Sequence, residues 1–379
     1  MEPPTSFDDV SLDELRRRRS IKWRRYPEDV LPAWVAELDF PLAPPVHRAL
    51  ADAVGRADTG YANADGLPSA FAEFAADRWR WQVDAERTLL VADIMSGVGE
   101  LLRALTAPGD GVVVNPPVYP PFFNMVNDVG RELVEAPLGP DWRLDLDALE
   151  AAFSGGARCY LLCSPHNPTG TVHRRGELAA VAELAERHDV LVISDEVHAP
   201  MTLRGATHVP YLEVGAESGL ALVSASKAWN VPGLKCALAV AASERTASLL
   251  RRVPEHVRFH VGHFGVLANI AAYAGGGRWL DGLVAHLDAQ RDRVAELLAA
   301  ELPDVRHVRP EAGYLVWLDC RPLGLGDDPS AVFLERGRVA LSPGLPFGSQ
   351  GKGFARLNVG TSGALLAEAV TRMRSALDG

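Results

Sequence analysis

The sequence predicts an α/β fold, in which a mainly parallel sheet is covered by helices on both faces and is followed by a smaller α+β domain. Two observations in the 379-residue chain support this. In its middle part, short continuous apolar runs alternate with segments of helical apolar spacing, which is typical of parallel strands buried on both faces. After residue 278 the alternation gives way to one long amphipathic stretch and a few more short strands.

The elements of the sheet follow one another along the chain. Apolar runs predict strands over 111–115, 131–137, 159–163, 190–194 and 220–224. A helix is expected to begin at Glu100, after a turn at Ser96-Gly-Val-Gly99, and two more over 145–153 and 176–188. Further on, apolar residues at helical spacing over 280–298 predict a long helix. Strands at 314–318 and 355–358 and a helix at 331–336 complete the smaller domain.

Composition narrows the possible functions. The chain has 38 basic and 49 acidic residues and a net charge of −11, which argues against binding to nucleic acid or to an anionic membrane. Its one basic run, Arg16 to Arg19, is more typical of the solvated end of a helix. Residues 1–10 show no export signal and no apolar stretch reaches about 18 residues, so a cytoplasmic enzyme is expected. The four scattered cysteines predict buried free thiols, with neither a disulfide framework nor a zinc site.

Polar loops after the apolar runs are the candidate site, because ligands of a parallel sheet bind beyond the carboxyl ends of its strands. Alone, each loop has an ordinary explanation: a glycine turn, a β-turn at Asn167-Pro-Thr-Gly170, a helix cap at Asp195, a solvated Lys227. However, 28 residues separate Asn167 from Asp195 and 32 separate Asp195 from Lys227, about one excursion of such a sheet each. An amide, an anion, an amine and a helix N-terminus in one crevice are what pyridoxal phosphate (PLP) requires.

Four longer segments then show a resemblance to a known family. They are 31–40 (LPAWVAELDF), 117–123 (PVYPPFF), 194–198 (SDEVH) and 226–234 (SKAWNVPGL). Over essentially its whole length the chain resembles the fold-type I PLP enzymes of the class I/II aminotransferase group, and most of all their cystathionine β-lyase, or carbon-sulfur lyase, branch (the MalY/PatB type). The resemblance implies an aspartate aminotransferase-like fold with a seven-stranded sheet. It also implies an N-terminal segment 1–45 that joins the small domain, a large PLP-binding domain 46–275, a C-terminal small domain 276–379, and a homodimer with shared active sites.

The resemblance also implies roles for individual residues. Lys227 holds PLP as a Schiff base and then acts as the general base, Asp195 pairs with the pyridinium nitrogen, and Asn167 contacts the phenolic oxygen. Tyr119 stacks on the ring, unless it is simply a core tyrosine. The phosphate is held by Gly97, Val98, Ser224 and Ser226, and by Tyr61 of the neighbouring subunit. Arg356 clamps the substrate carboxylate, the alternative being a surface arginine, and Trp34, Phe122 and Asn124 are candidates for the side-chain pocket.

Two positions depart from the usual aminotransferase pattern. Lys235 stands eight residues after the lysine, where those enzymes have a phosphate-binding arginine, so its contact with the phosphate is in question. His198 stands where many have tyrosine, as in the lyase branch, and either a structural role or a role near the cofactor is open. A different chemistry, the S-x-x-K of serine acyl enzymes, also fits Ser224-Ala-Ser-Lys227, but its companion motifs are missing.

The expected function is α,β-elimination on cystathionine or related cysteine S-conjugates, giving a thiol such as homocysteine, pyruvate and ammonia, as in methionine biosynthesis. An aminotransferase on the same fold and a PLP-binding regulatory protein are the alternatives. The sequence does not decide between these three functions.

Overall fold

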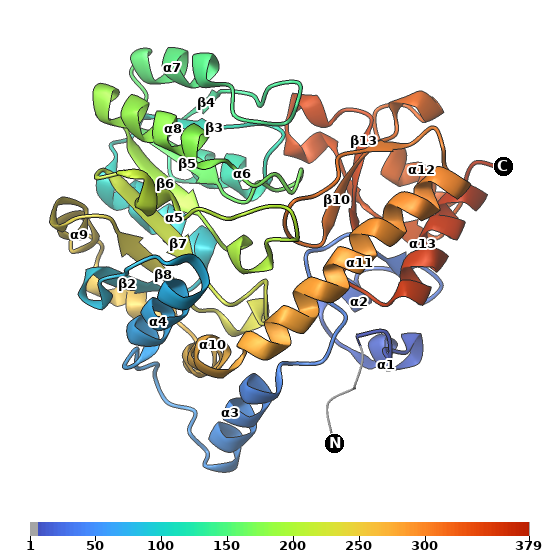
Figure 1. Cartoon of the computed structure of the whole chain (residues 1–379), viewed down its shortest axis with the longest axis horizontal. Helices are drawn as coiled ribbons and strands as arrows, with labels where there is room; N and C mark the ends of the chain where they lie inside the picture. Colours follow the sequence, from blue (N-terminus) through green and yellow to red (C-terminus); the bar gives the residue numbers. More distant parts are fainter. Residues whose placement is uncertain (1–6, 379) are drawn as a thin grey trace.

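A central sheet of seven strands forms the larger part of the molecule (Figure 1). The structure is a computed structural model that describes residues 7–378. The strands are β2 (Thr88–Val91), β3 (Gly111–Val114), β4 (Glu132–Glu135), β5 (Cys159–Cys163), β6 (Leu191–Asp195), β7 (Gly219–Val223) and β8 (Ala237–Ala241), in the order β2-β8-β7-β6-β5-β3-β4. Six of them run in one direction and β8 runs against its neighbours. The mainly parallel sheet is confirmed.

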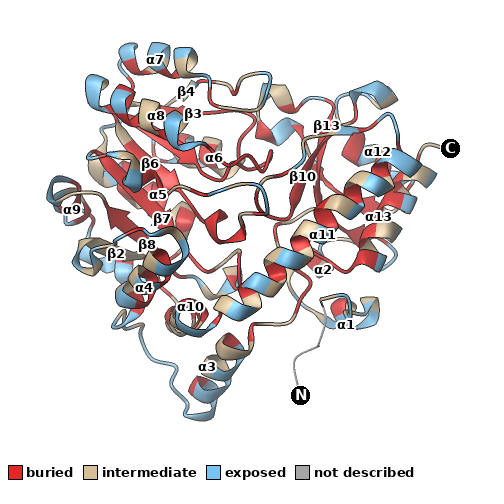
Figure 2. Cartoon of the chain, viewed as in Figure 1, coloured by how far each residue is buried: buried red, intermediate tan, exposed pale blue. Residues whose placement is uncertain are grey.

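Helices cover both faces of this sheet, and β5 shows why. Cys159, Leu161 and Cys163 pack into one apolar cluster, whereas Tyr160 and Leu162 pack into another. Since side chains alternate along a strand, the continuous apolar run supplies both faces at once. The first cluster lies under α5 (Ile94–Leu105), α6 (Pro121–Asp128) and α9 (Glu244–Leu250), and the second under α7 (Leu146–Ser154) and α8 (Arg175–His188). Buried residues accordingly fill the strands and line the inner sides of the helices (Figure 2).

A third and larger cluster joins the sheet to the rest of the chain. It includes residues of α3 (Pro44–Gly55), α4 (Leu67–Trp79) and α10 (His263–Gly275), together with inward-facing residues of β7 and β8. It continues along α11 (Gly277–Glu301), the long helix that crosses from the neighbourhood of α10 toward the C-terminal part (Figure 1). The long helix predicted after residue 278 is therefore present.

The C-terminal part is built on an antiparallel sheet of four strands. These are β9 (Arg306–His307), β10 (Leu315–Asp319), β12 (Ser342–Pro343) and β13 (Phe354–Asn358), accompanied by α12 (Pro329–Glu335) and α13 (Gly363–Ser375). The N-terminal segment, with α1 (Leu12–Arg17) and α2 (Ile21–Arg24), adds β1 (Leu31–Pro32) in parallel to β11 (Val339–Ala340). The domain boundaries near residues 45 and 275 stay a prediction, and residues 1–6 of the first segment lie outside the described residues.

One predicted element is wrong in its start. Helix α5 begins at Ile94, six residues before Glu100, so Ser96-Gly-Val-Gly99 is part of the helix and not a turn before it. Asp93 caps the helix: its Oδ1 accepts a hydrogen bond of 2.7 Å from the backbone N–H of Ser96. Ser96 and the two glycines are typical of a loop, but the cap at Asp93 starts the helix before them.

Three smaller predictions can also be compared with the structure. All four cysteines are buried and free. The basic run stands at the end of α1, and one of its members, Arg18, turns inward to donate to the carbonyls of Leu38, Asp39 and Phe40. Across residues 7–378, none of the helices has the length and apolar character needed to cross a membrane.

Candidate active site

A cavity of about 340 Å³ opens at the carboxyl ends of β5, β6 and β7. Seven residues predicted for the site line it: Tyr119, Asn167, Asp195, His198, Ser226, Lys227 and Lys235. It is also lined by residues to which the sequence had given no individual role in the site: Ala36, Asp93, Ile94, Met95, Pro121, Cys163, Val197, Pro232 and Cys236. The structure therefore brings Asn167, Asp195 and Lys227 together, as their spacing predicts.

Strand register explains this meeting. Cys163, the last residue of β5, pairs with Asp195, the last residue of β6, and Asp195 pairs in turn with Leu222 of β7. The three strands thus end side by side, and the loops that leave them carry Asn167 and Lys227 to the same edge.

Asp195 is a buried carboxylic acid with few partners. Its Oδ1 accepts a hydrogen bond of 3.1 Å from the backbone N–H of Val197, and no cation among the described residues forms an ion pair with it. Burial raises its pKa to about 7, an effect that the nearby Lys227 charge partly opposes. A buried carboxyl in this state is suited to a cationic ligand atom such as a protonated ring nitrogen.

Lys227 is a half-buried amine whose pKa is lowered toward neutrality. Its Nζ donates to the carbonyl of Ala36 at 3.3 Å. Burial, aided by the charge of Arg356, lowers its pKa to about 8. More of this amine is therefore unprotonated at neutral pH than of an exposed lysine, which suits it to attack a carbonyl or to accept a proton.

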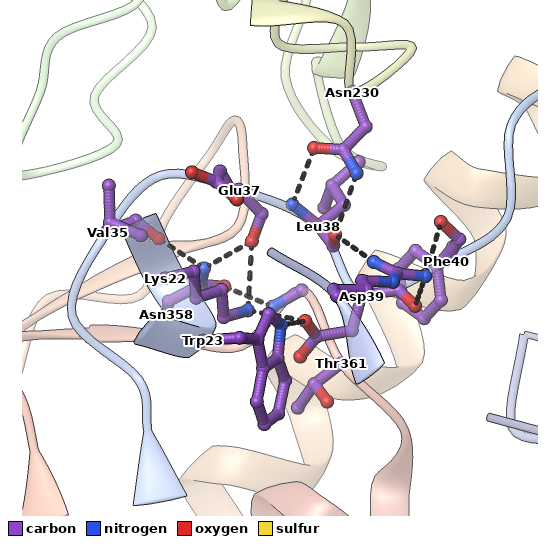
Figure 3. Close-up of polar contacts among 12 residues, drawn as sticks. Lys22, Trp23, Val35, Glu37, Leu38, Asp39, Phe40, Asn230, Asn358 and Thr361 are labelled. Carbon is purple, nitrogen blue, oxygen red and sulfur yellow. Dashed lines mark hydrogen bonds and ion pairs between the residues drawn. The ribbon is translucent and has the colours of Figure 1, made fainter. Parts of the chain in front are cut away.

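The Ala36 carbonyl is held in place by a polar network around residues 35–40 (Figure 3). Lys22 forms a fully buried ion pair of 2.8 Å with Asp39. Asn230, three residues after Lys227, accepts from the N–H of Leu38 and donates to its carbonyl. Asn358 donates to two further carbonyls of the segment. The N-terminal segment is thus tied both to the loop of Lys227 and to the strand of Arg356.

Arg356 is a buried cation without an anion. Its Nη1 donates to Oδ1 of Asn167 at 2.9 Å, and its Nη2 donates to the carbonyl of Trp34 and to Oγ of Ser342, both at 3.1 Å. Its Nε has no partner, and within residues 7–378 no carboxylate forms an ion pair with it. Burial lowers its pKa to about 10, so it stays charged at neutral pH. Such a guanidinium can donate two hydrogen bonds to a ligand carboxylate. The alternative of a surface arginine is wrong, because Arg356 is buried.

His198 and Tyr119 complete the walls around these groups. Burial, together with the charges of Lys227 and Arg356, lowers the pKa of His198 to about 3, so its imidazole is neutral. Burial also raises the pKa of Tyr119, which keeps its proton. Both lie on the cavity, and neither is enclosed in the core.

At the end of the cavity predicted to hold the phosphate, three of the predicted contact residues are not among the lining residues. The N–H of Gly97 donates to the carbonyl of Asp93 at 2.8 Å, and its Cα faces Val91 and Leu222. Val98 is buried in the apolar core under α5. The Ser224 hydroxyl donates to the carbonyl of Cys236 at 2.7 Å. None of these three residues lines the cavity. Gly97 and Val98 lie inside α5, which begins six residues earlier than expected, and the Ser224 hydroxyl is engaged by the carbonyl of Cys236.

Other residues take their place at this end. Asp93, Ile94 and Met95, from the cap and first turn of α5, line the cavity together with Ser226. Lys235 lies there too, with its Nζ 2.7 Å from Oδ2 of Asp93. The one sequence signal for this turn was an aspartate followed by apolar residues at helical spacing.

The remaining predicted residues lie outside this cavity. Trp34 contributes its backbone carbonyl to Arg356, Phe122 is buried in the core under α5 and α6, and Asn124 is exposed. Phe122 therefore does not line this cavity, and its place in a side-chain pocket stays a prediction. Tyr61 is 86% exposed and lies edge-on to Phe259, so its predicted contact with a neighbouring subunit stays a prediction.

A larger hollow of about 1040 Å³ lies elsewhere, between α3, α4 and the junction of α10 with α11. Phe74, Tyr273 and Trp279 are among its lining residues. It holds none of the residues predicted for the site, so size alone does not identify the functional cavity.

Comparisons with known proteins agree with this geometry. The family model "Aminotransferase class I and II" matches residues 29–373. A cystathionine β-lyase of Corynebacterium glutamicum is 35% identical, over 97% of this chain and 99% of its own, and a candidate cystathionine β-lyase of Mycobacterium leprae is 48% identical, over 98% of each. The crystal structure of a candidate PLP-dependent β-cystathionase from Corynebacterium diphtheriae superposes with a TM-score of 0.93 at 34% identity, over 100% of this chain and 99% of the other. The chain belongs to the class I and II aminotransferase family.

Proposed function

We propose that this protein is a PLP-dependent carbon-sulfur β-lyase that acts on cystathionine or a related cysteine S-conjugate. The observation that carries the proposal is the pairing of two features in one small region: a half-buried Lys227 near a buried Asp195, and a buried Arg356 with no anionic partner among the described residues. Relatives named cystathionine β-lyase, at 33% and 35% identity, support the choice of reaction.

The residues present fit PLP. Asp195, buried without a cation, would pair with the protonated ring nitrogen, and Lys227 would bind the cofactor aldehyde covalently. Asn167 and the neutral His198 would lie near the phenolic oxygen, and Tyr119 would cover the ring. The phosphate would contact the free N–H groups of Ile94 and Met95 and the Ser226 hydroxyl. When bound, PLP supplies a sink for the electron pair left at the substrate Cα.

Arg356 would orient the substrate. A guanidinium can grip both oxygens of an α-carboxylate, and this one is held in place by Asn167, Ser342 and the carbonyl of Trp34. Because the site is preformed, little ordering is left for the moment of binding. The bound amino group then faces the loop of Lys227.

Lys227 would move the proton. With a pKa lowered to about 8, its amine can accept the proton from the substrate Cα at neutral pH. With a thiolate at Cβ, departure of the sulfur follows, the thiol leaves, and the remaining three-carbon fragment hydrolyses to pyruvate and ammonia. The alternative reaction is transamination, in which Lys227 would return the proton without loss of the Cβ substituent. The matching family model, aminotransferase class I and II, includes this alternative in its name.

The test is product analysis on purified, PLP-loaded protein. Cystathionine without any keto acid should give homocysteine and pyruvate in equal amounts, and Lys227→Ala should give neither. Arg356→Lys, which keeps the charge but not the fork, serves as the matched control for substrate binding. A strict requirement for a keto-acid acceptor would make the protein an aminotransferase. Binding of PLP without any turnover would make it a regulatory protein.

We also propose that the protein acts as a homodimer in which Tyr61 reaches the partner's phosphate site. Tyr61 and Phe259 are exposed aromatic side chains in edge-on contact. Adjacent exposed aromatic side chains are typical of a surface that binds another protein. Mixing inactive Lys227→Ala with weakened Tyr61→Ala chains tests this, because a hybrid dimer contains one site with both lesions and one with neither. Recovery of activity on mixing is expected, and no recovery in verified hybrids would contradict shared sites.

A further inference from the structure

The N-terminus of α5 meets the cavity with a negative charge of its own. The first N–H groups of a helix have no partner inside the helix, and such a terminus attracts anions. Here the cap is Asp93, whose Oδ1 accepts from Ser96 and whose side chain is only 29% exposed. An anionic ligand that approaches Ile94 and Met95 therefore meets a carboxylate already in place.

Lys235 offsets that carboxylate. Its Nζ lies 2.7 Å from Oδ2 of Asp93. Its backbone is fixed in the left-handed region, at φ +58°, and its carbonyl accepts from the N–H of Gly262. Burial alone would raise the pKa of Asp93, but hydrogen bonds from Lys235 and Ser96 hold it below its usual range. Asp93 therefore stays charged, and its ion-pair partner Lys235 places the opposite charge next to it at this end of the cavity.

We propose that Asp93 limits the affinity of the phosphate subsite and that Lys235 is shared between Asp93 and the phosphate. The inference rests on the proposed PLP site. The dianion would be held mainly by neutral N–H and hydroxyl donors, with only part of the Lys235 charge available to it. Asp93 is a positioning residue in this scheme, acting through Lys235 and through the cap of α5.

The two functions of Asp93 can be separated by one substitution. Asparagine caps a helix about as well as aspartate but carries no charge. Asp93→Asn should therefore preserve α5 while freeing Lys235 for the phosphate. Lys235→Gln should do the reverse, leaving the Asp93 charge uncompensated.

The experiment is a double-mutant cycle on PLP affinity, measured by absorbance titration of the PLP-free protein. Lys235→Gln should weaken PLP about tenfold, the effect of losing a charged hydrogen bond. Asp93→Asn should tighten PLP about fivefold, since one of two close like charges is gone. The double variant should lie near wild type. Pyridoxal, which lacks the phosphate, should bind equally to all four proteins, and Lys352→Gln, which removes the exposed ion pair to Asp327, is the control.

Two results of the cofactor titrations would overturn the proposal. One is weaker or unchanged PLP binding by a folded Asp93→Asn protein. The other is a set of pyridoxal affinities that move in parallel with those of PLP, which would mean a general distortion. Thermal stabilisation by inorganic phosphate gives a second readout without cofactor: it should be larger in Asp93→Asn than in wild type, and equal values would also contradict the inference. Lyase activity enters none of these measurements, so a failed β-lyase assay would leave them standing.

Discussion

Two basic residues beside the cavity are in opposite states. Arg356, which the proposed function places at a carboxylate end, does not line the cavity but donates to its lining residue Asn167. It is 5% exposed and touches neutral groups alone. Lys235, a lining residue at the proposed phosphate end, has a side chain that is 55% exposed and forms an ion pair with Asp93. The charge of Arg356 is available to an anionic ligand, whereas Lys235 already has an ion-pair partner. Under the proposed function, we therefore expect substrate selection to depend mainly on Arg356.

Physical chemistry makes this difference large. An ion pair formed at a buried, low-dielectric site is strengthened by the absence of competing water. An exposed pair such as Lys235 with Asp93 is screened and contributes on the order of 1 kcal/mol or less. Ligand binding should therefore respond steeply to changes around Arg356 and gently to changes around Lys235.

The largest expected effect is that of Arg356→Gln. Losing a two-pronged charged contact should lower kcat/KM for cystathionine about a thousandfold, while PLP affinity changes less than about twofold. Arg356→Lys should recover part of the loss. Steady-state kinetics and PLP titration on the same preparations check this. A parallel fall in substrate and cofactor affinity would erase the distinction between the two ends.

A second prediction concerns the network that supports the carboxylate end. Lys22→Met leaves Asp39 buried without its partner and should destabilise the protein by about 3 kcal/mol in chemical denaturation. Residues 35–40 include Ala36 and directly follow Trp34, whose carbonyl supports Arg356. We therefore expect KM to rise while PLP affinity stays unchanged. Lys352→Met, at an exposed pair, should change stability little. Equal losses in both variants would contradict the burial argument.

Asp195→Asn gives a pH-dependent prediction for the PLP-free protein. The folded pKa of Asp195, about 7, lies above that of an unfolded aspartate, so its ionisation costs stability increasingly as pH rises from about 4 to 7. Removing the charge should stabilise the protein by roughly 4 kcal/mol at pH 8, and this gain should vanish toward pH 4. Thermal unfolding at several pH values measures it. A pH-independent difference would mean that another contact is responsible.

The smallest effect is expected from Ser342→Ala. Ser342 accepts from Arg356 and donates to the carbonyl of Trp34 at 2.6 Å. Its loss removes one of several supports of the guanidinium, so KM should rise about threefold with kcat unchanged. A change of the size expected for Arg356→Gln would mean that the fork depends on this single hydroxyl.

The sequence predicts the groups that stand at strand ends. Strand β5 was expected at 159–163 and is found there, and the register of β5 and β6 brings Asn167 and Asp195 to one edge as their separation implies. Such positions are legible because a buried strand has a strong apolar signal and a polar residue marks its end.

The rest of the site depends on contacts that no spacing encodes. The carbonyl of Trp34 meets Arg356, and the carbonyl of Ala36 meets the Tyr314 hydroxyl, each across some three hundred residues of chain. The start of α5 was missed because Ser96, Gly97 and Gly99 are poor helix formers. Gly97 packs closely against Val91 and Leu222, and Gly99 packs against Met125, so tertiary contacts override that preference.

The ties around residues 35–40 have a consequence for the order of synthesis. Lys22 and Asp39 emerge from the ribosome before Asn230 and Asn358, which hold the same segment from later parts of the chain. The segment that carries the carbonyl against Lys227 is therefore fully anchored only after β13 has been made. A nascent chain that still lacks β13 lacks both Asn358 and Arg356, so it can neither fix this segment nor supply the guanidinium beside the cavity.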